Sequence, residues 1–117
     1  MGITYVKATL TGPRSARQEV RFLVDSGASY SVLPNEVWKK LKLKPKRTVS
    51  FSLADGTAIE REVSECHFTF GQEEGHSPVV LGEPGDVALL GAITLENLGL
   101  VLDPFKRRLQ PMRMLLA

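Results

Sequence analysis

Short segments of strand-forming residues, separated by turn residues, follow one another along most of this chain. Residues 3–10 form one such segment, which ends at a Gly-Pro pair. In QEVRFLVD, Val20, Phe22 and Val24 alternate with other residues and therefore share one face. Helix signals are few. The pattern is typical of an all-β domain, a small closed barrel or sandwich with one or two short helices, and not of repeated strand-helix-strand units.

A hairpin is predicted for TVSFSLADGTAIEREV, residues 48–63, where apolar residues alternate with hydroxyl residues up to Asp55-Gly56. This dipeptide is favoured in tight two-residue turns. A separate strand is expected beyond the hairpin, with Cys66, Phe68 and Phe70 on one face. Further strands are expected in SPVVL, LGLVLD and LQPMRMLL, and GQEEGHSP is expected to be a loop.

Two short helices are expected. PNEVWKKL begins with Pro34, which is acceptable at a first helical position, and sets its apolar residues on one side. AITLENLG has apolar residues at helical spacing and stops at Gly99, a residue suited to a left-handed helix end.

Length and composition predict one soluble domain covering residues 1–117. The chain is 43% hydrophobic and 24% charged, close to the average of globular proteins, and its net charge of +2 is too small to indicate electrostatic capture of nucleic acid. Cys66 is the only cysteine, which suits a reducing compartment. Neither a signal peptide nor an apolar run of membrane-spanning length is present, so we expect a cytoplasmic protein without membrane association.

The stretch FLVDSGASYSVLP places Asp25 directly after an apolar strand. An ionised carboxylate in such a setting needs hydrogen bonds, and the residues that follow can supply them. Gly27 permits a turn in which amide N–H groups point at the carboxylate, while Ala28 leaves room for a ligand. Ser26 adds a hydroxyl that can donate and accept.

FLVDSGAS resembles the catalytic turn of the retropepsin-like aspartic proteases, including the bacterial single-domain members, whose signature is Asp-Thr/Ser-Gly-Ala after a hydrophobic strand. A second segment, ALLGAITLENLGLVLDP, is similar to the family's later segment, in which two apolar residues and a glycine precede a short helix and a strand. Here these three residues are Leu89, Leu90 and Gly91, and the resemblance implies that they pack beside the catalytic turn. The predicted hairpin between the two segments occupies the place of the family's flap.

The resemblance implies an aspartic endopeptidase in which two carboxylates share one proton. The ionised carboxylate takes a proton from a water that attacks the peptide carbonyl, and the protonated one donates to the carbonyl oxygen, without metal or cofactor. Because the chain contains the Asp-Ser-Gly turn once, the second carboxylate must come from another copy. We therefore expect a homodimer with both Asp25 side chains on a twofold axis, acting on a polypeptide in extended conformation.

By the same resemblance, Ser26 bridges the two turns, Gly27 contacts the carboxylates and substrate, and Ala28 shapes the floor of the site. The residues expected to bind substrate or to form the flap are Ser29, Leu53, Ala54, Asp55, Gly56 and Thr57. The chain departs from familiar viral members at Ser29 and Ala92, where those proteases carry an acidic residue and an arginine that pair.

Other readings of the same residues carry less weight. The main alternative is a catalytically weak or inactive dimeric module that binds peptides on the same fold. No phosphate-binding Gly-Lys-Ser/Thr motif is present, and no Gly-x-Ser-x-Gly elbow accompanies the serines. The basic run KKLKLKPKR has no interleaved aromatic residues beyond Trp38 at its edge, so we predict a solvated face there and no nucleic-acid partner.

Overall fold

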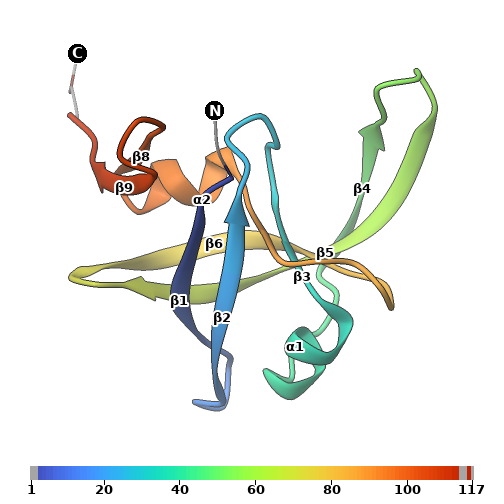
Figure 1. Cartoon of the computed structure of the whole chain (residues 1–117). Coiled ribbons are helices and arrows are strands. Elements are labelled where there is room, and N and C mark those ends of the chain that lie inside the picture. Colours follow the sequence, from blue (N-terminus) through green and yellow to red (C-terminus); the bar gives the residue numbers. More distant parts are fainter. Residues whose placement is uncertain (1–2, 114–115, 117) are drawn as a thin grey trace.

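The computed structural model describes residues 3–113 and residue 116. In these residues the chain is mostly strand, with two short helices (Figure 1). The elements in chain order are β1 (Tyr5–Thr11), β2 (Arg17–Val24), β3 (Ser31–Leu33), α1 (Asn35–Lys40), β4 (Arg47–Ser52), β5 (Ala58–Phe70), β6 (Glu73–Leu81), β7 (Leu89–Leu90), α2 (Ala92–Asn97), β8 (Leu100–Asp103) and β9 (Arg108–Pro111). The predicted all-β class with short helices is confirmed.

Seven strands form one sheet in the order β1-β2-β7-β3-β6-β5-β4, and an additional pairing of β1 with β5 closes it. The short strand β7 lies between β2 and β3, parallel to the first and antiparallel to the second. This insertion brings a late segment of the chain against the ends of two early strands. Strands β8 and β9 form a separate two-stranded sheet beside α2 (Figure 1).

The region from the hairpin to residue 81 differs from the sequence prediction. One strand, β5, continues through the second hairpin arm and the strand expected beyond it. The expected loop GQEEGHSP is mostly strand, because β6 begins at Glu73 and pairs with β5 as far as Phe70. Gly71, with φ of 60°, makes the turn between them. Polar residues here occupy paired strands rather than a loop, because an antiparallel pair with one face in water accepts polar side chains on that face.

Both helices were predicted, with slightly longer bounds. Pro34 lies at the N-cap of α1 rather than inside the helix. Gly99 follows α2 with φ of 69°, the left-handed end that the sequence predicts, and Lys42 adopts a similar φ of 61° after α1. Neither helix in the described residues is long or apolar enough to cross a membrane.

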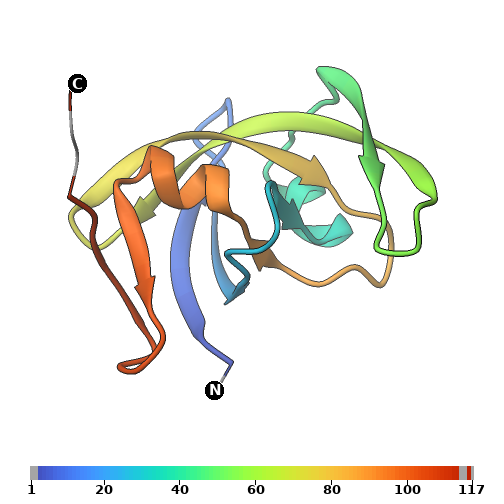
Figure 2. The same cartoon turned by 90° about the horizontal axis from the view of Figure 1, so that it is seen from above.

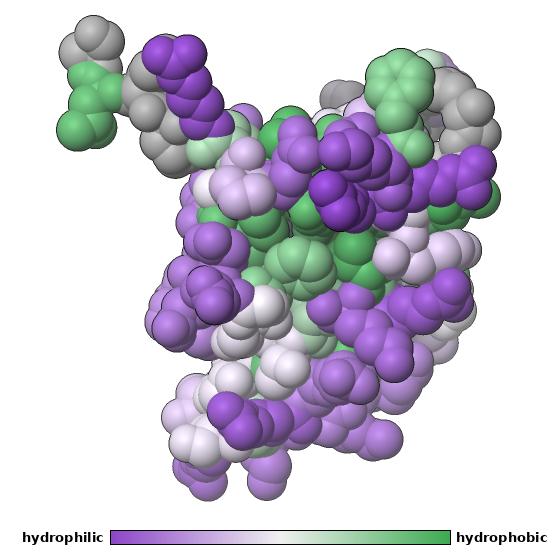
Figure 3. Space-filling view, turned by 60° about the vertical axis from the view of Figure 1, so that its left-hand side comes forward, coloured by the Kyte–Doolittle hydropathy of each residue, from purple (hydrophilic) through white to green (hydrophobic). Residues whose placement is uncertain are grey.

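The core lies inside the closed sheet and beneath α2. Phe22 of β2 and Phe68 of β5 are fully buried, with ring centroids 5.8 Å apart. The predicted inward face of β2 is confirmed, since Val20 and Val24 are buried beside Phe22. Figure 3 shows the molecular surface on the β8–β9 side, where mainly hydrophilic residues surround a central hydrophobic patch. These buried side chains fix the strand whose end carries Asp25.

Cys66, which was expected on the same strand face as Phe68, is buried with it in this core, and burial raises the pKa of the Cys66 thiol to about 12. Because the thiolate is the reactive form, the folded protein should react with a thiol reagent such as dithionitrobenzoate at neutral pH only as fast as it unfolds. The same thiol should react immediately in denaturant. Rapid reaction of the native protein would contradict the buried placement of this side chain.

Candidate active site

Asp25 lies at the end of β2, where the chain leaves the sheet. Its backbone N–H donates to the carbonyl oxygen of Leu90 at 2.9 Å, which ties the start of the turn to β7. The Gly27 N–H donates to Asp25 Oδ1 at 3.1 Å, and the Ala28 N–H donates to the Asp25 carbonyl at 3.1 Å. The carboxylate is thus oriented by the backbone of its own turn, as the sequence predicts, while Asp25 remains exposed to solvent.

Gly91 packs against the other side of this turn. A Cβ atom placed on Gly91 would lie 2.6 Å from the carbonyl carbon and oxygen of Tyr30 and 3.0 Å from the Ala28 oxygen. The first residues of α2 continue the contact, since the Ala92 N–H donates to the Ala28 carbonyl at 2.8 Å and the Ile93 N–H to the Ser29 carbonyl at 3.0 Å. The turn is therefore held by β7 and the start of α2. This agrees with the prediction that Leu89, Leu90 and Gly91 pack beside the turn.

A buried hydroxyl network underlies this contact and was not predicted from the sequence. Ser31 Oγ accepts from the Gly91 N–H at 3.0 Å and lies 2.5 Å from Thr94 Oγ1. Thr94 Oγ1 in turn lies 2.8 Å from Ser77 Oγ. All three hydroxyl residues are buried, so their bonds form in a low-dielectric interior and fix α2 against β3 and β6.

A cavity of about 440 Å³ opens beside the catalytic turn. Gly27, Ala28 and Ser29 form one wall, and Phe51 and Ile59 from the two hairpin arms face them. The remaining lining residues are Tyr30, Val32, Ser52, Arg61, Val80, Asp86, Val87 and Leu89. The walls are mainly apolar, and such a cavity suits an apolar side chain next to the carboxylate.

The β4–β5 hairpin is the structural counterpart of the expected flap. Its loop is longer than predicted: Leu53 pairs with Thr57 through an N–H to carbonyl bond of 2.7 Å, and Gly56 takes φ of 91°. This is the three-residue type of hairpin connection, in which a left-handed glycine ends the turn. The hairpin arms line the cavity, whereas the tip, residues 53–57, is exposed and lies outside the lining. Figure 2 shows the catalytic turn between this hairpin and the α2–β8–β9 side.

Three contacts join the hairpin arms to the rest of the site. Tyr30, next to the catalytic turn, accepts a hydrogen bond from Arg47 Nη2 at 2.8 Å and packs edge-on against Phe51, with ring centroids 5.3 Å apart. On the other arm, Arg61 Nη1 lies 3.5 Å from a Glu83 carboxylate oxygen. These residues were not singled out from the sequence, because their partners lie at least 17 positions away along the chain.

The carboxylate of Asp55 stabilises the loop at the tip of the hairpin. Its Oδ1 accepts from the Thr57 hydroxyl at 2.7 Å and the Thr57 N–H at 2.9 Å, and these bonds lower the pKa of Asp55 below the ordinary value of an aspartate. Because the ionised form is stabilised by folding, its contribution is complete above the unfolded pKa and is lost as pH falls through the lower folded pKa. An NMR titration should show Asp55 and the Thr57 amide shifting together, with a midpoint below that of an aspartate in the unfolded chain. A midpoint above that value would contradict the turn.

The predicted departures from the viral pattern are visible in the contacts. Ser29 accepts a backbone bond from Ile93, and Ala92 donates one to Ala28, so backbone groups and not a side-chain ion pair connect the two segments at these positions. Among residues 3–113 and 116, no group of three or more His, Cys, Asp or Glu side chains is arranged to hold a metal ion. The turn presents an exposed carboxylate, oriented by the Gly27 amide, beside a mainly apolar cavity.

Asp25 on the outer end of β2, the strand β7 beside it and the hairpin facing it together define a retropepsin-like aspartic protease. The aspartyl protease family model matches residues 6–100, which is most of the chain. The protein belongs to this family of aspartic endopeptidases. No curated protein matches the chain.

Solved structures with the same fold come from bacteria and viruses. A retropepsin-like aspartic protease from Rickettsia conorii is 26% identical, with a TM-score of 0.60, covering 88% of this chain and 78% of that one. The equine infectious anaemia virus (EIAV) protease, complexed with the inhibitor HBY-793, is 18% identical with a TM-score of 0.58, covering 84% and 89%. The simian foamy virus (mac) protease is 17% identical with a TM-score of 0.56, covering 80% and 92%.

Proposed function

We propose that this protein cleaves polypeptides as a homodimer whose catalytic dyad consists of Asp25 from each subunit. The observation that supports this most directly is the single Asp-Ser-Gly turn with an exposed carboxylate. Asp86, the other aspartate near the cavity, uses its Oδ2 to accept from the Glu83 N–H at 2.8 Å. A dyad partner is therefore best supplied by symmetry, which brings identical turns together on the axis.

In this mechanism the two carboxylates share one proton, because like charges a few ångströms apart do not both ionise readily. The ionised carboxylate accepts a proton from water as the water attacks the scissile carbonyl, and the other carboxylic acid protonates the carbonyl oxygen. The Gly27 N–H holds Asp25 in place during this transfer. The Ser26 hydroxyl is exposed beside Asp25 and is available to bond across the axis.

The substrate in this proposal is an extended segment that lies between the flap hairpins and the floor formed by residues 27–29. An extended chain can pair with backbone groups on both sides, and the apolar cavity beside Ala28 would take one of its side chains. Closure of the hairpins over this segment would exclude bulk water from the dyad.

Subunit mixing tests the shared dyad. Wild-type protein is mixed and re-equilibrated with increasing amounts of the Asp25→Asn variant at constant total concentration, and cleavage of a peptide library is measured at mildly acidic and neutral pH. Because a mixed dimer holds one aspartate, activity should fall as the square of the wild-type fraction. A linear fall would show that one subunit suffices. Absence of turnover in the wild-type dimer would favour the peptide-binding module.

A further inference from the structure

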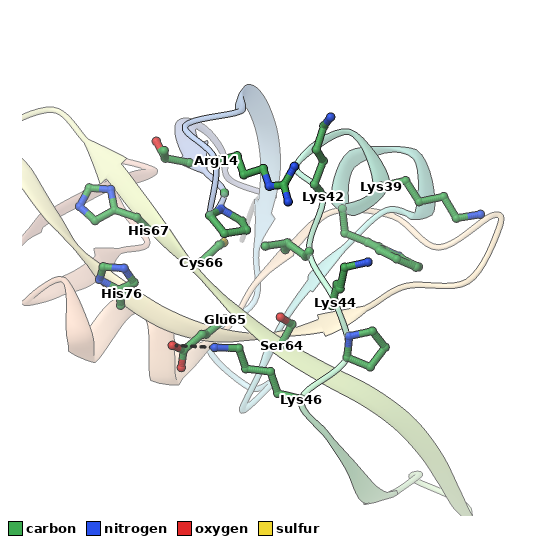
Figure 4. A pocket seen from close by; sticks show the side chains of 16 residues that line it. Arg14, Lys39, Lys42, Lys44, Lys46, Ser64, Glu65, Cys66, His67 and His76 are labelled. Carbon is green, nitrogen blue, oxygen red and sulfur yellow. Dashed lines mark hydrogen bonds and ion pairs between the residues drawn. The ribbon is translucent and has the colours of Figure 1, made fainter.

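A second cavity, of about 900 Å³, lies away from the catalytic turn and shares no lining residue with the cavity beside Asp25. We call it the basic groove. It is bounded by the β1–β2 connection, by the segment from α1 to the start of β4, and by the middle of β5. Its basic side chains are Arg14, Lys39, Lys42, Lys44 and Lys46, and Figure 4 shows them around β5.

Positive charge in this groove is largely uncompensated. Glu65 is the only carboxylate in the lining, and it pairs with Lys46 at 3.3 Å. Figure 4 shows Lys46 reaching to Glu65, while Arg14 and Lys42 stand free of that pair. Among the described residues, no ion pair includes the other four basic side chains of the groove. The groove therefore attracts an anionic ligand.

The floor of the groove contains an unpaired piece of strand edge. Opposite Glu65 on β6 is Pro78, which has no N–H, so the Glu65 backbone groups point away from β6 toward the groove. On that side of β5, pairing with β4 ends at Val63 and pairing with β1 begins at His67. No backbone hydrogen bond from the described loop residues fills the gap at Glu65. One N–H and one carbonyl are thus open to an added strand.

Lys42 has a left-handed backbone conformation, which glycine adopts more easily than any other residue. It follows α1 with φ of 61°, and its N–H donates to the Lys39 carbonyl at 3.0 Å, which closes the helix end. A non-glycine residue in this left-handed conformation costs stability. The lysine at this position therefore adds positive charge to the groove at some cost in stability.

We propose that the basic groove is a second peptide site, which binds an extended acidic segment as an added strand beside Glu65. An acidic segment supplies the charges that the groove lacks, and its backbone matches the open N–H and carbonyl. Nucleic acid fits less well, because the one large aromatic residue is not a free stacking surface. Trp38 donates its indole N–H to the Gly82 carbonyl at 2.9 Å, and the Lys39 ammonium lies 5.7 Å from the centre of its ring.

The acidic segment is part of the polypeptide substrate, remote from the bond that is cleaved. This assignment rests on the proposed function, whereas peptide binding in the groove does not. A second contact on the same substrate would raise the effective concentration of the scissile segment at the dyad. Substrates with an acidic extension should then have a lower KM with little change in kcat.

Binding is measured by fluorescence anisotropy with the Asp25→Asn protein and a labelled peptide of alternating Glu and Thr, at low and high salt. Lys42→Glu/Lys44→Glu should weaken binding at least about tenfold, whereas Lys7→Glu/Lys106→Glu, with the same charge change outside the groove, should change it far less.

Two single variants test individual residues of the groove. Lys42→Gly should weaken binding while keeping or raising the melting temperature. Glu65→Gln should strengthen binding because it frees Lys46. Equal affinity of the peptide for all these variants would contradict peptide binding in the basic groove.

Two further measurements separate an added strand from simple charge attraction. The same peptide with methylated amides should bind about fivefold more weakly, since it cannot donate to the Glu65 carbonyl. A single-stranded oligonucleotide of equal charge should compete less well than the peptide. Unchanged affinity after methylation would disprove strand pairing, and a better competing oligonucleotide would assign the groove to nucleic acid. Because Asp25→Asn is used throughout, these results stand whether or not the wild-type protein cleaves peptides.

Discussion

Replacing Asp25 with asparagine should lower kcat for peptide hydrolysis by at least about 10³-fold. General acid or base catalysis by one positioned group contributes about 10²–10⁴ in rate, and in a homodimer this substitution removes both proton-transferring groups together. The fold should be retained, because the Asp25 side chain is exposed and an asparagine oxygen can still accept from the Gly27 N–H. The measurement is steady-state hydrolysis of the best substrate found in a peptide library, with melting temperature measured in parallel.

Asp103→Asn provides the matched control for this loss. Asp103 also orients a turn with its carboxylate, accepting from the Phe105 N–H at 3.0 Å, but it lies at the β8–β9 connection and outside the catalytic cavity. The same change of charge and size there should leave kcat within about twofold, as surface substitutions usually do. Substantial turnover by a correctly folded Asp25→Asn protein would rule out the carboxylate dyad.

The order of segments was enough to predict the turn at Asp25 and the segment that packs beside it, because each segment carries a local signal. Asp25-Ser26-Gly27 stands at the end of an apolar strand, and Leu89-Leu90-Gly91 precedes a helix that ends at a glycine. Such signals lie within a few residues of one another, where backbone preferences and apolar spacing act. The structure brings the two segments into contact at Asp25 and Leu90.

Features that depend on distant partners could not be predicted in the same way. Ser31 and Thr94 are 63 positions apart, and no residue near either one in the sequence indicates that they bond to each other. The strand character of Glu73–Ser77 comes from pairing with β5, which overrides its polar composition. The basic run at residues 39–47 has exposed basic side chains, as predicted, but its position beside the middle of β5 depends on residues far away along the chain. In each of these cases, contacts between residues far apart in the sequence determine the local structure.

Gly91→Ala should both destabilise the protein and nearly abolish its activity. The backbone of Gly91, with φ of −99° and ψ of 176°, is extended and suits any residue, so the requirement for glycine comes from space alone. The added methyl would lie 2.6 Å from the Tyr30 carbonyl, and backbone rather than a flexible side chain must move to accept it. Overpacking of this kind costs about 1–3 kcal/mol in the free energy of unfolding.

The catalytic loss should exceed what the stability loss explains. The displaced carbonyls belong to the segment that follows Asp25, and a shift of about 1 Å in a catalytic group can lower the rate about 10²-fold. Gly75→Ala is the control, because a Cβ there would meet the Asn97 oxygen at 3.5 Å and Leu98 Cδ2 at 3.7 Å, which are ordinary contacts. Its kcat should stay near that of the wild type. If Gly91→Ala kept full kcat at a temperature where it is folded, close packing behind the turn would not be what positions Asp25.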